Sequence, residues 1–149
     1  MSTSFYDNSV HVDKIVNGYV IDHITAGRGI EVYEHLNLKK LDCSVALIQN
    51  VRSSKYGRKD IIKVAELINI DTDILSYIDP RITLTTVRNN EVTKNSLTPP
   101  KTLTGVVKCR NPRCITSSED TLRHVFCLSK ESRENKPVYR CVYCEQENA

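Results

Sequence analysis

Residues 108–118 read KCRNPRCITSS and residues 139–146 read YRCVYCEQ, and these two stretches decide the fold of the C-terminal part of the chain. Four residues separate Cys109 from Cys114, and two separate Cys141 from Cys144. Each closely spaced pair can supply two of the four soft donors that a tetrahedral zinc ion needs. The spacing therefore predicts one structural Zn²⁺ per chain, held by Cys109, Cys114, Cys141 and Cys144.

The other readings of these cysteines are weaker. Free buried thiols remain the structural alternative, and a redox C-x-x-C at residues 141–144 would need a thioredoxin-like βαβ context. Four cysteine ligands close the coordination shell, so the metal is expected to stabilise structure and not to catalyse. Cys127 could replace a ligand but is expected in the core, and Cys43 has no neighbouring cysteine.

The segment TKNSLTPPK, residues 93–101, has the composition of a linker, because Pro99 and Pro100 lack backbone donors. We therefore expect a domain at 1–100 and a zinc domain at 101–149. A domain of about 50 residues usually needs a staple such as a metal.

Composition indicates a globular protein, with 40% hydrophobic and 26% charged residues among 149. No apolar run approaches the ~18 residues of a membrane span, and we expect a cytoplasmic protein with no membrane partner. Residues 101–149 carry 9 Lys and Arg against 6 Asp and Glu. Four thiolates and one Zn²⁺ would reduce that excess to about +1, which disfavours the alternative hypothesis of a zinc-ribbon nucleic-acid-binding protein.

The periodicity of the first domain alternates between strand and helix, with Ile30, Tyr33 and Leu36 at helical spacing. The expected elements are a strand at 19–24, a helix within 26–38, a strand around 45–47, a strand over 58–65, a helix at 72–78 capped by Asp71, and two extended segments around Asn89-Asn90. As a strand, RKDIIKVA places Lys59, Ile61 and Lys63 on one face. The order is the β-α-β-β-α-β motif of a ferredoxin-like domain. The predicted fold class is α+β, with a small all-β zinc-binding domain following.

Taken in order, GYVIDHI at 18–24, GRKDIIKV at 57–64 and the two cysteine pairs resemble the regulatory chain of aspartate carbamoyltransferase. The resemblance extends from about Val10 to Glu147. It implies a non-catalytic subunit of pyrimidine biosynthesis whose N-terminal domain binds CTP or ATP and pairs with a second regulatory chain. It also implies that the zinc domain docks onto the catalytic chain.

The resemblance assigns a role to several individual residues. It places the following at the nucleotide: Asp22 and Lys63 at the ribose, His23 and Lys59 near the phosphates, and Ile15 and Val92 beside the base. Two lysines and a histidine offer charge-assisted donors to a triphosphate. Without the resemblance, the histidine is more often structural and the lysines a solvated face.

At the zinc turns, the resemblance implies that Asn111 and Glu145 face the catalytic chain, whereas Arg113 replaces the Asn of relatives. The chain also departs from the family near the nucleotide. Asn90 replaces a tyrosine, and Asn95 stands where the family has a phosphate-binding lysine, with Lys94 one place earlier and expected on the opposite side of the sheet.

A third hypothesis is an acylphosphatase-like enzyme on the same topology. It would need an anion-binding loop after the first strand, and HITAGRG at 23–29, with Arg28, is only a faint match. The sequence has no Gly-rich phosphate loop and no G-x-S-x-G elbow, so a non-catalytic chain is expected.

Overall fold

The structure is a computed structural model that describes residues 14–133 and 136–147. The chain forms two compact units, one from residues up to Asn69 with Thr83–Asn95, the other from Ile70–Ile82 with residues from Ser96 onward. The helix expected at 72–78 therefore belongs to the second unit. The boundary near residue 100 stays a prediction, as a division of the sequence. None of the helices in the described ranges is long and apolar enough to cross a bilayer.

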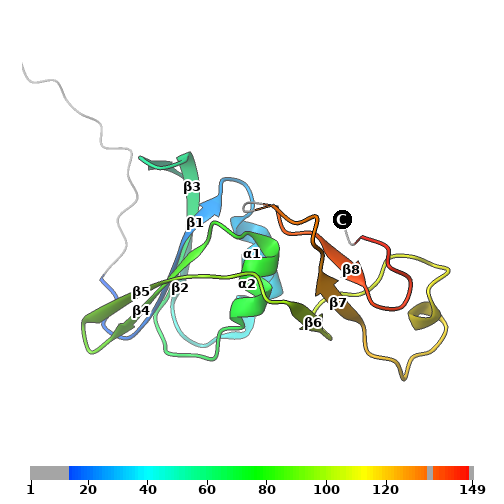
Figure 1. Cartoon of the computed structure of the whole chain (residues 1–149). Helices are drawn as coiled ribbons and strands as arrows, with labels where there is room; N and C mark the ends of the chain where they lie inside the picture. Colours follow the sequence, from blue (N-terminus) through cyan, green and yellow to red (C-terminus); the bar gives the residue numbers. More distant parts are fainter. Residues whose placement is uncertain (1–13, 134–135, 148–149) are drawn as a thin grey trace, which may run out of the picture. The chain divides into compact units, whose positions relative to one another are not determined.

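The first unit is built on a five-stranded sheet with the strand order β2-β3-β1-β4-β5 (Figure 1). Its elements are β1 (Gly18–Thr25), α1 (Gly29–His35), the 3-10 turn η1 (Leu38–Lys40), β2 (Val45–Ser53), β3 (Gly57–Val64), β4 (Thr83–Arg88) and β5 (Glu91–Ser96). With α2 (Thr72–Ile78) between β3 and β4, the chain order is the expected β-α-β-β-α-β followed by a short last strand. The ferredoxin-like prediction is confirmed.

Strand β3 alternates as predicted. Asp60, Ile62 and Val64 are buried, whereas Lys59, Ile61 and Lys63 are half-buried on the other side. In β1, Ile21 and Ile24 are fully buried, opposite Ile62 and Asp60 of β3. Burial of these aliphatic side chains, each worth about 1.5–3 kcal/mol, fixes which face of the sheet turns inward.

Helix α1 packs on the inward face of the sheet (Figure 1). Its buried residues are Gly29 and Val32, and not Ile30, which is 49% exposed. A Cβ on Gly29 would lie 2.7 Å from Leu47 Cδ1 and 2.8 Å from Asp60 Oδ2, so glycine permits the close approach of helix and sheet. Helical spacing alone identified the helix but not its buried side.

The β4–β5 hairpin turns at Asn89 and Asn90, which both have positive φ, at 49° and 68°. This is the turn geometry that suits a two-residue hairpin, and asparagine tolerates it well. Strand β5 continues to Ser96, so the irregular connection is shorter than the segment 93–101 that composition suggested.

The second unit contains a three-stranded antiparallel sheet of β6 (Thr102–Thr104), β7 (Val125–Leu128) and β8 (Tyr139–Cys141), with the 3-10 turn η2 (Ile115–Ser117). Leu103, Phe126 and Tyr139 form its apolar core together with Cys114 and Cys141. The predicted cap is confirmed in α2, where the Asp71 carboxylate accepts from two backbone amides of the first turn. Tyr77 of α2 packs edge-on against Tyr139, at 5.6 Å between ring centroids.

Candidate functional site

Four cysteine sulfurs meet in the second unit. The Sγ atoms of Cys109, Cys114, Cys141 and Cys144 all lie within 4.8 Å of one another. The Cys109–Cys144 separation is 3.7 Å and the Cys114–Cys141 separation is 3.8 Å. Sulfurs at about 2.3 Å from a tetrahedral zinc are ~3.8 Å apart, so the donor set fits Zn²⁺.

Neighbouring groups hold this cluster in place. Thr116 donates its hydroxyl to Cys114 Sγ at 3.1 Å, which lowers the pKa of that thiol. The Gln146 amide, followed by the Asn111 side chain, lowers the pKa of Cys144 to about 7. His124 Nδ1 accepts from the Cys109 amide at 3.1 Å. Sequence spacing identified the ligands but gave no sign of these supporting residues.

Burial acts in the opposite direction on the other two thiols. It raises the pKa of Cys109 to about 12 and also raises the pKa of Cys141. Four adjacent thiolates repel one another, so a divalent cation is the group that allows all four to ionise together. The expectation of a structural zinc site is supported by this geometry.

The remaining two cysteines lie outside the cluster. Cys127 is exposed on β7, so the expectation that it belongs to the core was wrong. Phe126, its neighbour, takes the inward position because successive residues of a strand face opposite sides. Cys43 is half-buried, and burial and then the charge of Glu66 raise its thiol pKa.

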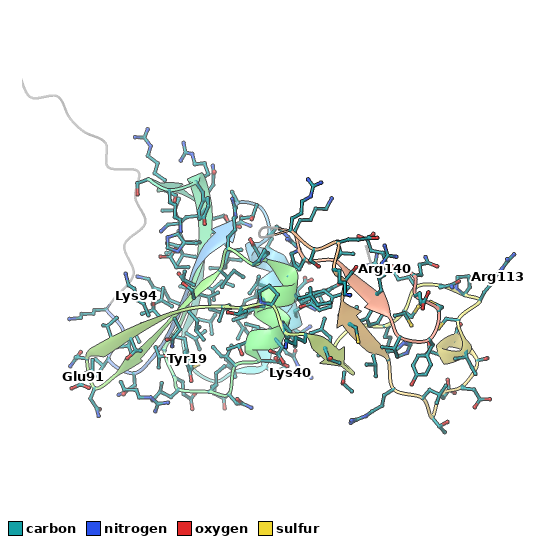
Figure 2. The ribbon with its side chains drawn as sticks, viewed as in Figure 1. Tyr19, Lys40, Glu91, Lys94, Arg113 and Arg140 are labelled. Carbon is teal, nitrogen blue, oxygen red and sulfur yellow. The ribbon has the colours of Figure 1, made fainter. Side chains whose placement is uncertain are left out.

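The zinc turns carry both residues expected to face a partner. Asn111 accepts from the Arg113 amide through its side chain and from the Cys114 amide through its carbonyl. Glu145 is exposed with φ at 63°, and its amide donates to Cys141 O. Figure 2 shows Arg113 projecting outward from the first turn.

In the first unit, three of the expected nucleotide residues lie in contact. Lys59 Nζ is 2.9 Å from Asp22 Oδ1, and the His23 amide donates to the same oxygen at 2.7 Å. The contacts come from the sheet face opposite α1, which carries Asp22, Lys59 and Lys63 and is called the polar face below. Burial would raise the pKa of Asp22, but the hydrogen bonds from Lys59 and His23 outweigh it and lower that pKa.

A β-bulge in β1 presents His23. Ile21 pairs with Ile62 and Ile24 with Asp60, so Asp22 and His23 together oppose a single residue of β3. His23 has φ at 58°, and its Nδ1 lies 2.8 Å from Thr83 Oγ1. Burial lowers the pKa of His23, and the positive charges of Lys59, Lys55 and Lys94 lower it further against the effect of Asp22.

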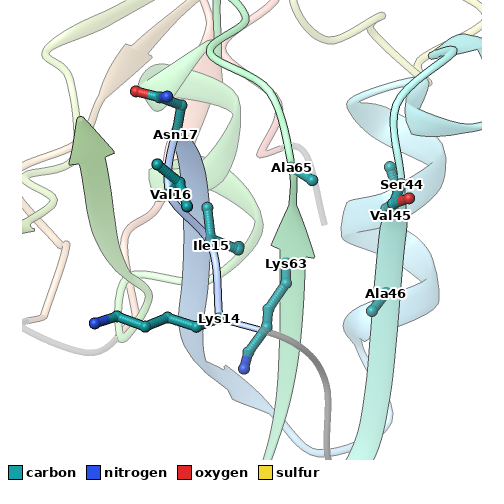
Figure 3. A pocket seen from close by; sticks show the side chains of 9 residues that line it. All are labelled: Lys14, Ile15, Val16, Asn17, Ser44, Val45, Ala46, Lys63 and Ala65. Atoms are coloured by element: carbon teal, nitrogen blue, oxygen red, sulfur yellow. The ribbon is translucent and has the colours of Figure 1, made fainter. Parts of the chain in front are cut away.

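Two other expected residues line a cavity of about 440 Å³ near the start of β1. Ile15 and Lys63 both border it, and Figure 3 shows Lys63 between Ile15 and Ala46 of β2. The size falls in the range of small-molecule pockets. Val92 is 57% exposed on β5 and is not among the residues that line this cavity.

Lys94 adds a cation that the sequence had placed elsewhere. Strands β4 and β5 are neighbours joined by the two-residue turn at Asn89 and Asn90, which implies that Arg88 lies opposite Glu91. Counting along both strands then sets Lys94 opposite Thr85, which pairs with Val20 on its other side. Val20 in turn pairs with Lys63, on the polar face. Lys94, and not Asn95, therefore faces the side of Lys63, and Figure 2 shows it on the side of the sheet away from α1.

Comparison with known proteins identifies the family to which the chain belongs. The family described as aspartate carbamoyltransferase regulatory chain, allosteric domain, matches residues 10–98, and its metal binding domain matches residues 101–149. The chain belongs to the aspartate carbamoyltransferase regulatory chain family. As the regulatory chains of a pyrimidine-pathway enzyme, members of this family are non-catalytic, and the cysteine cluster lies within the part that matches the family's metal-binding domain.

Several curated regulatory chains of aspartate carbamoyltransferase are similar over nearly their full length. One from Clostridium tetani is 47% identical over 137 residues, covering 91% of this chain and 93% of its own. One from Clostridium botulinum strain Hall is 46% identical over 136 residues and 91% of each chain. One from Bifidobacterium longum is 37% identical over 139 residues, 93% of this chain and 98% of its own.

Proposed function

We propose that the first unit of this regulatory chain binds a nucleotide effector of the CTP or ATP type on its polar face. The observation that carries the proposal is the convergence of Asp22, His23 and Lys59 beside the cavity-lining Lys63. Lys63 and Lys59 are four residues apart on one strand, ~13 Å, which suits the length of a sugar and its phosphates. The cations supply charge-assisted donors to an anionic ligand.

The Asp22–Lys59 ion pair suits the site without ligand. A phosphate group competes for the Lys59 ammonium, which would release the Asp22 carboxylate to accept hydrogen bonds from ribose hydroxyls. The Asp22 carboxylate would thus bind Lys59 in the free site and the ribose in the nucleotide-bound site. The Lys59 side chain is 15% exposed and the Asp22 side chain 24% exposed, so neither exchange requires the core to open.

Substitution of the two lysines tests the nucleotide site. Lys59→Ala and Lys63→Ala should each weaken CTP and ATP binding by about 1.5–3 kcal/mol, the range for hydrogen bonds to charged groups. Calorimetric titration of the full chain measures this, with Lys40→Ala, an exposed lysine on η1, as the charge-matched control. Unchanged binding in both lysine variants would remove the polar face from consideration.

We further propose that the zinc turns dock onto the catalytic chain of aspartate carbamoyltransferase. The turns expose apolar side chains next to the predicted contacts Asn111 and Glu145. Ile115 is 52% exposed, and Val142 and Tyr143 are each 43% exposed. Exposed apolar groups beside polar ones are typical of a protein interface.

Regulation then requires that the nucleotide bind two states of the assembly unequally, with a coupling free energy of typically ~1–3 kcal/mol. A second regulatory chain is the other proposed partner. Among the described residues, β2 and β5 form the two edges of the sheet, and pairing with a symmetric copy would cover one of these edges. Co-purification with an enzyme that converts carbamoyl phosphate and aspartate tests the assembly.

A further inference from the structure

The turn between β2 and β3 brings two side chains to one end of the polar face. Tyr56 meets the His23 ring edge-on, with 6.0 Å between centroids, and Lys55 Nζ lies 5.2 Å from the centroid of Tyr56. The turn is set by Gly57, with φ at 79°, and by a hydrogen bond from the Tyr56 amide to Ser53 Oγ. A hairpin loop of this length commonly uses glycine at the left-handed position.

Positive charge is concentrated at the end of the polar face next to the β2–β3 turn. Asp22 is neutralised by its ion pair with Lys59. Within residues 14–133 and 136–147, Lys55 and Lys94 make no ion pair with a carboxylate. Both are nevertheless close enough to lower the pKa of His23 by repulsion. The cations at this end therefore exceed the carboxylates, which favours a multiply charged anion.

The order of groups along the strands indicates how a bound nucleotide would be oriented on the polar face. The cavity with Ile15 and Lys63 lies at one end, Lys59 lies four residues further along β3, and the turn lies beyond Lys59. Figure 1 shows the β2–β3 hairpin extending past the other strands of the sheet. A nucleotide with its base in the cavity and its first phosphates at Lys59 points its terminal phosphate toward Lys55.

We propose that Lys55 binds the terminal phosphate of a nucleoside triphosphate, and that Tyr56 positions it by packing against both Lys55 and His23. The inference rests on the proposed nucleotide site and adds a residue that selects for phosphate number. Lys55 is exposed, so it can reach a ligand without disturbing the core. Its ammonium contacts the π face of Tyr56, which restricts the side chain beside the site.

Arg52 provides a matched control on the same hairpin. It pairs with Arg58, while the neighbouring pair on the ladder is Val51 with Lys59. Since successive pairs face opposite sides, Arg52 projects from the face away from the ligand. Arg52→Ala therefore removes the same charge at a similar distance along the strand but cannot remove a direct contact.

The experiment is calorimetric titration of the full chain with CTP, CDP and CMP. Lys55→Ala should weaken CTP binding by about three- to tenfold relative to Arg52→Ala, while CMP binding changes equally little in both. Lys55→Arg should retain most of the preference for CTP. Circular dichroism checks that each variant is folded, as expected for substitutions in an exposed turn.

The outcomes separate this inference from the proposed function. If CTP binds the parent chain and Lys55→Ala loses no more CTP affinity than Arg52→Ala, the role of Lys55 is refuted and the nucleotide site stands. An equal loss for CTP and CMP refutes the terminal-phosphate contact in the same way. If none of the three nucleotides binds the parent chain, the proposed site and this inference both fail.

Discussion

Replacing one zinc ligand should unfold the second unit and free the catalytic chain from regulation. Cys144→Ser removes one of four sulfurs that lie within 4.8 Å of one another, whereas Cys127→Ser changes an exposed thiol on β7 outside the cluster. The two variants therefore make the same chemical change, inside and outside the metal site. Cys43→Ser is a second control in the other unit.

The magnitude follows from what else holds the unit together. The hydrophobic cluster that includes the zinc ligands Cys114 and Cys141 has three other buried members, the large side chains of Leu103, Phe126 and Tyr139. Burial of three such side chains contributes about 4.5–9 kcal/mol. A structural zinc contributes ~10–16 kcal/mol to folding, more than this core supplies. Loss of the metal should therefore unfold the unit.

The assay measures zinc, assembly and regulation on the same preparation. Bound zinc is quantified by atomic absorption, association with the catalytic chain by sedimentation velocity, and regulation by the effect of CTP and ATP on the carbamoyltransferase rate. We expect Cys144→Ser to lose zinc and association and to leave an active catalytic chain that no longer responds to nucleotide. Cys127→Ser should match the parent chain in all three measurements.

Two results would refute this reasoning. One is a metal-free Cys144→Ser assembly that remains intact and nucleotide-responsive, which would show that the apolar core alone maintains the docking surface. The other is a loss of zinc in Cys127→Ser equal to that in Cys144→Ser. That outcome would mean that the ligands are not the four cysteines whose sulfurs converge.

Three further predictions concern the first unit. Burial and nearby cations lower the pKa of His23, and a bound polyphosphate should raise it, so CTP binding should take up a proton at pH values between the pKa of the free site and that of the complex. Calorimetry in buffers of different ionisation enthalpy should detect this uptake in the parent chain but not in His23→Gln, and equal uptake in both would contradict the prediction. Asp60 is fully buried, and its carboxylate accepts hydrogen bonds from the amides of Gly27, Gly29 and Asn50. Asp60→Ala should therefore lower the free energy of unfolding, measured in urea, by about 3–5 kcal/mol. A decrease below about 1 kcal/mol would show that water replaces the carboxylate as the acceptor. The full chain should sediment as a dimer of 17.0 kDa chains at micromolar concentration, whereas a monomer would argue against pairing through a sheet edge.

The sequence predicted the elements of the fold well, because each has a local cause. Asp71 marked the start of α2, alternation marked β3, and two asparagines marked the β4–β5 turn. The zinc ligands could also be predicted from the sequence, since their spacing reflects the geometry of a single metal. These are short-range signals, and sequence reasoning reads them directly.

The contacts between residues far apart in the sequence were harder to predict. Helical spacing favoured Ile30 as part of an apolar stripe, but the close approach of Gly29 to Asp60 turns Val32 inward instead. Similarly, Cys127 looked like a core residue because its neighbours are apolar, and only the pairing of β7 shows that it faces outward. Neither outcome depends on the residue itself, so local sequence could not decide it.

The cations of the proposed nucleotide site were also hard to predict from the sequence. An ungapped comparison assigned Asn95 to the phosphate position, but the side of a strand on which a residue lies depends on the register of the hairpin. The two-residue turn between β4 and β5, together with the β1–β4 register, implies that Lys94 lies on the polar face. Lys55 and Tyr56 were not identified at all, because their proximity to His23 arises from the turn between two paired strands.

The bulge at Asp22 and His23 allows the proposed nucleotide site to be altered separately from the stability of β1. Because two residues of β1 oppose one residue of β3, deleting His23 would restore uninterrupted pairing from Ile21 to Ile24 with the same aliphatic side chains facing inward. Such a shortened chain should fold at least as readily, since it also loses a residue with positive φ. It would nevertheless lack the imidazole between Thr83 and the lysines. The proposed site therefore predicts that deletion of a single codon leaves a chain that assembles with its partner but no longer responds to nucleotide.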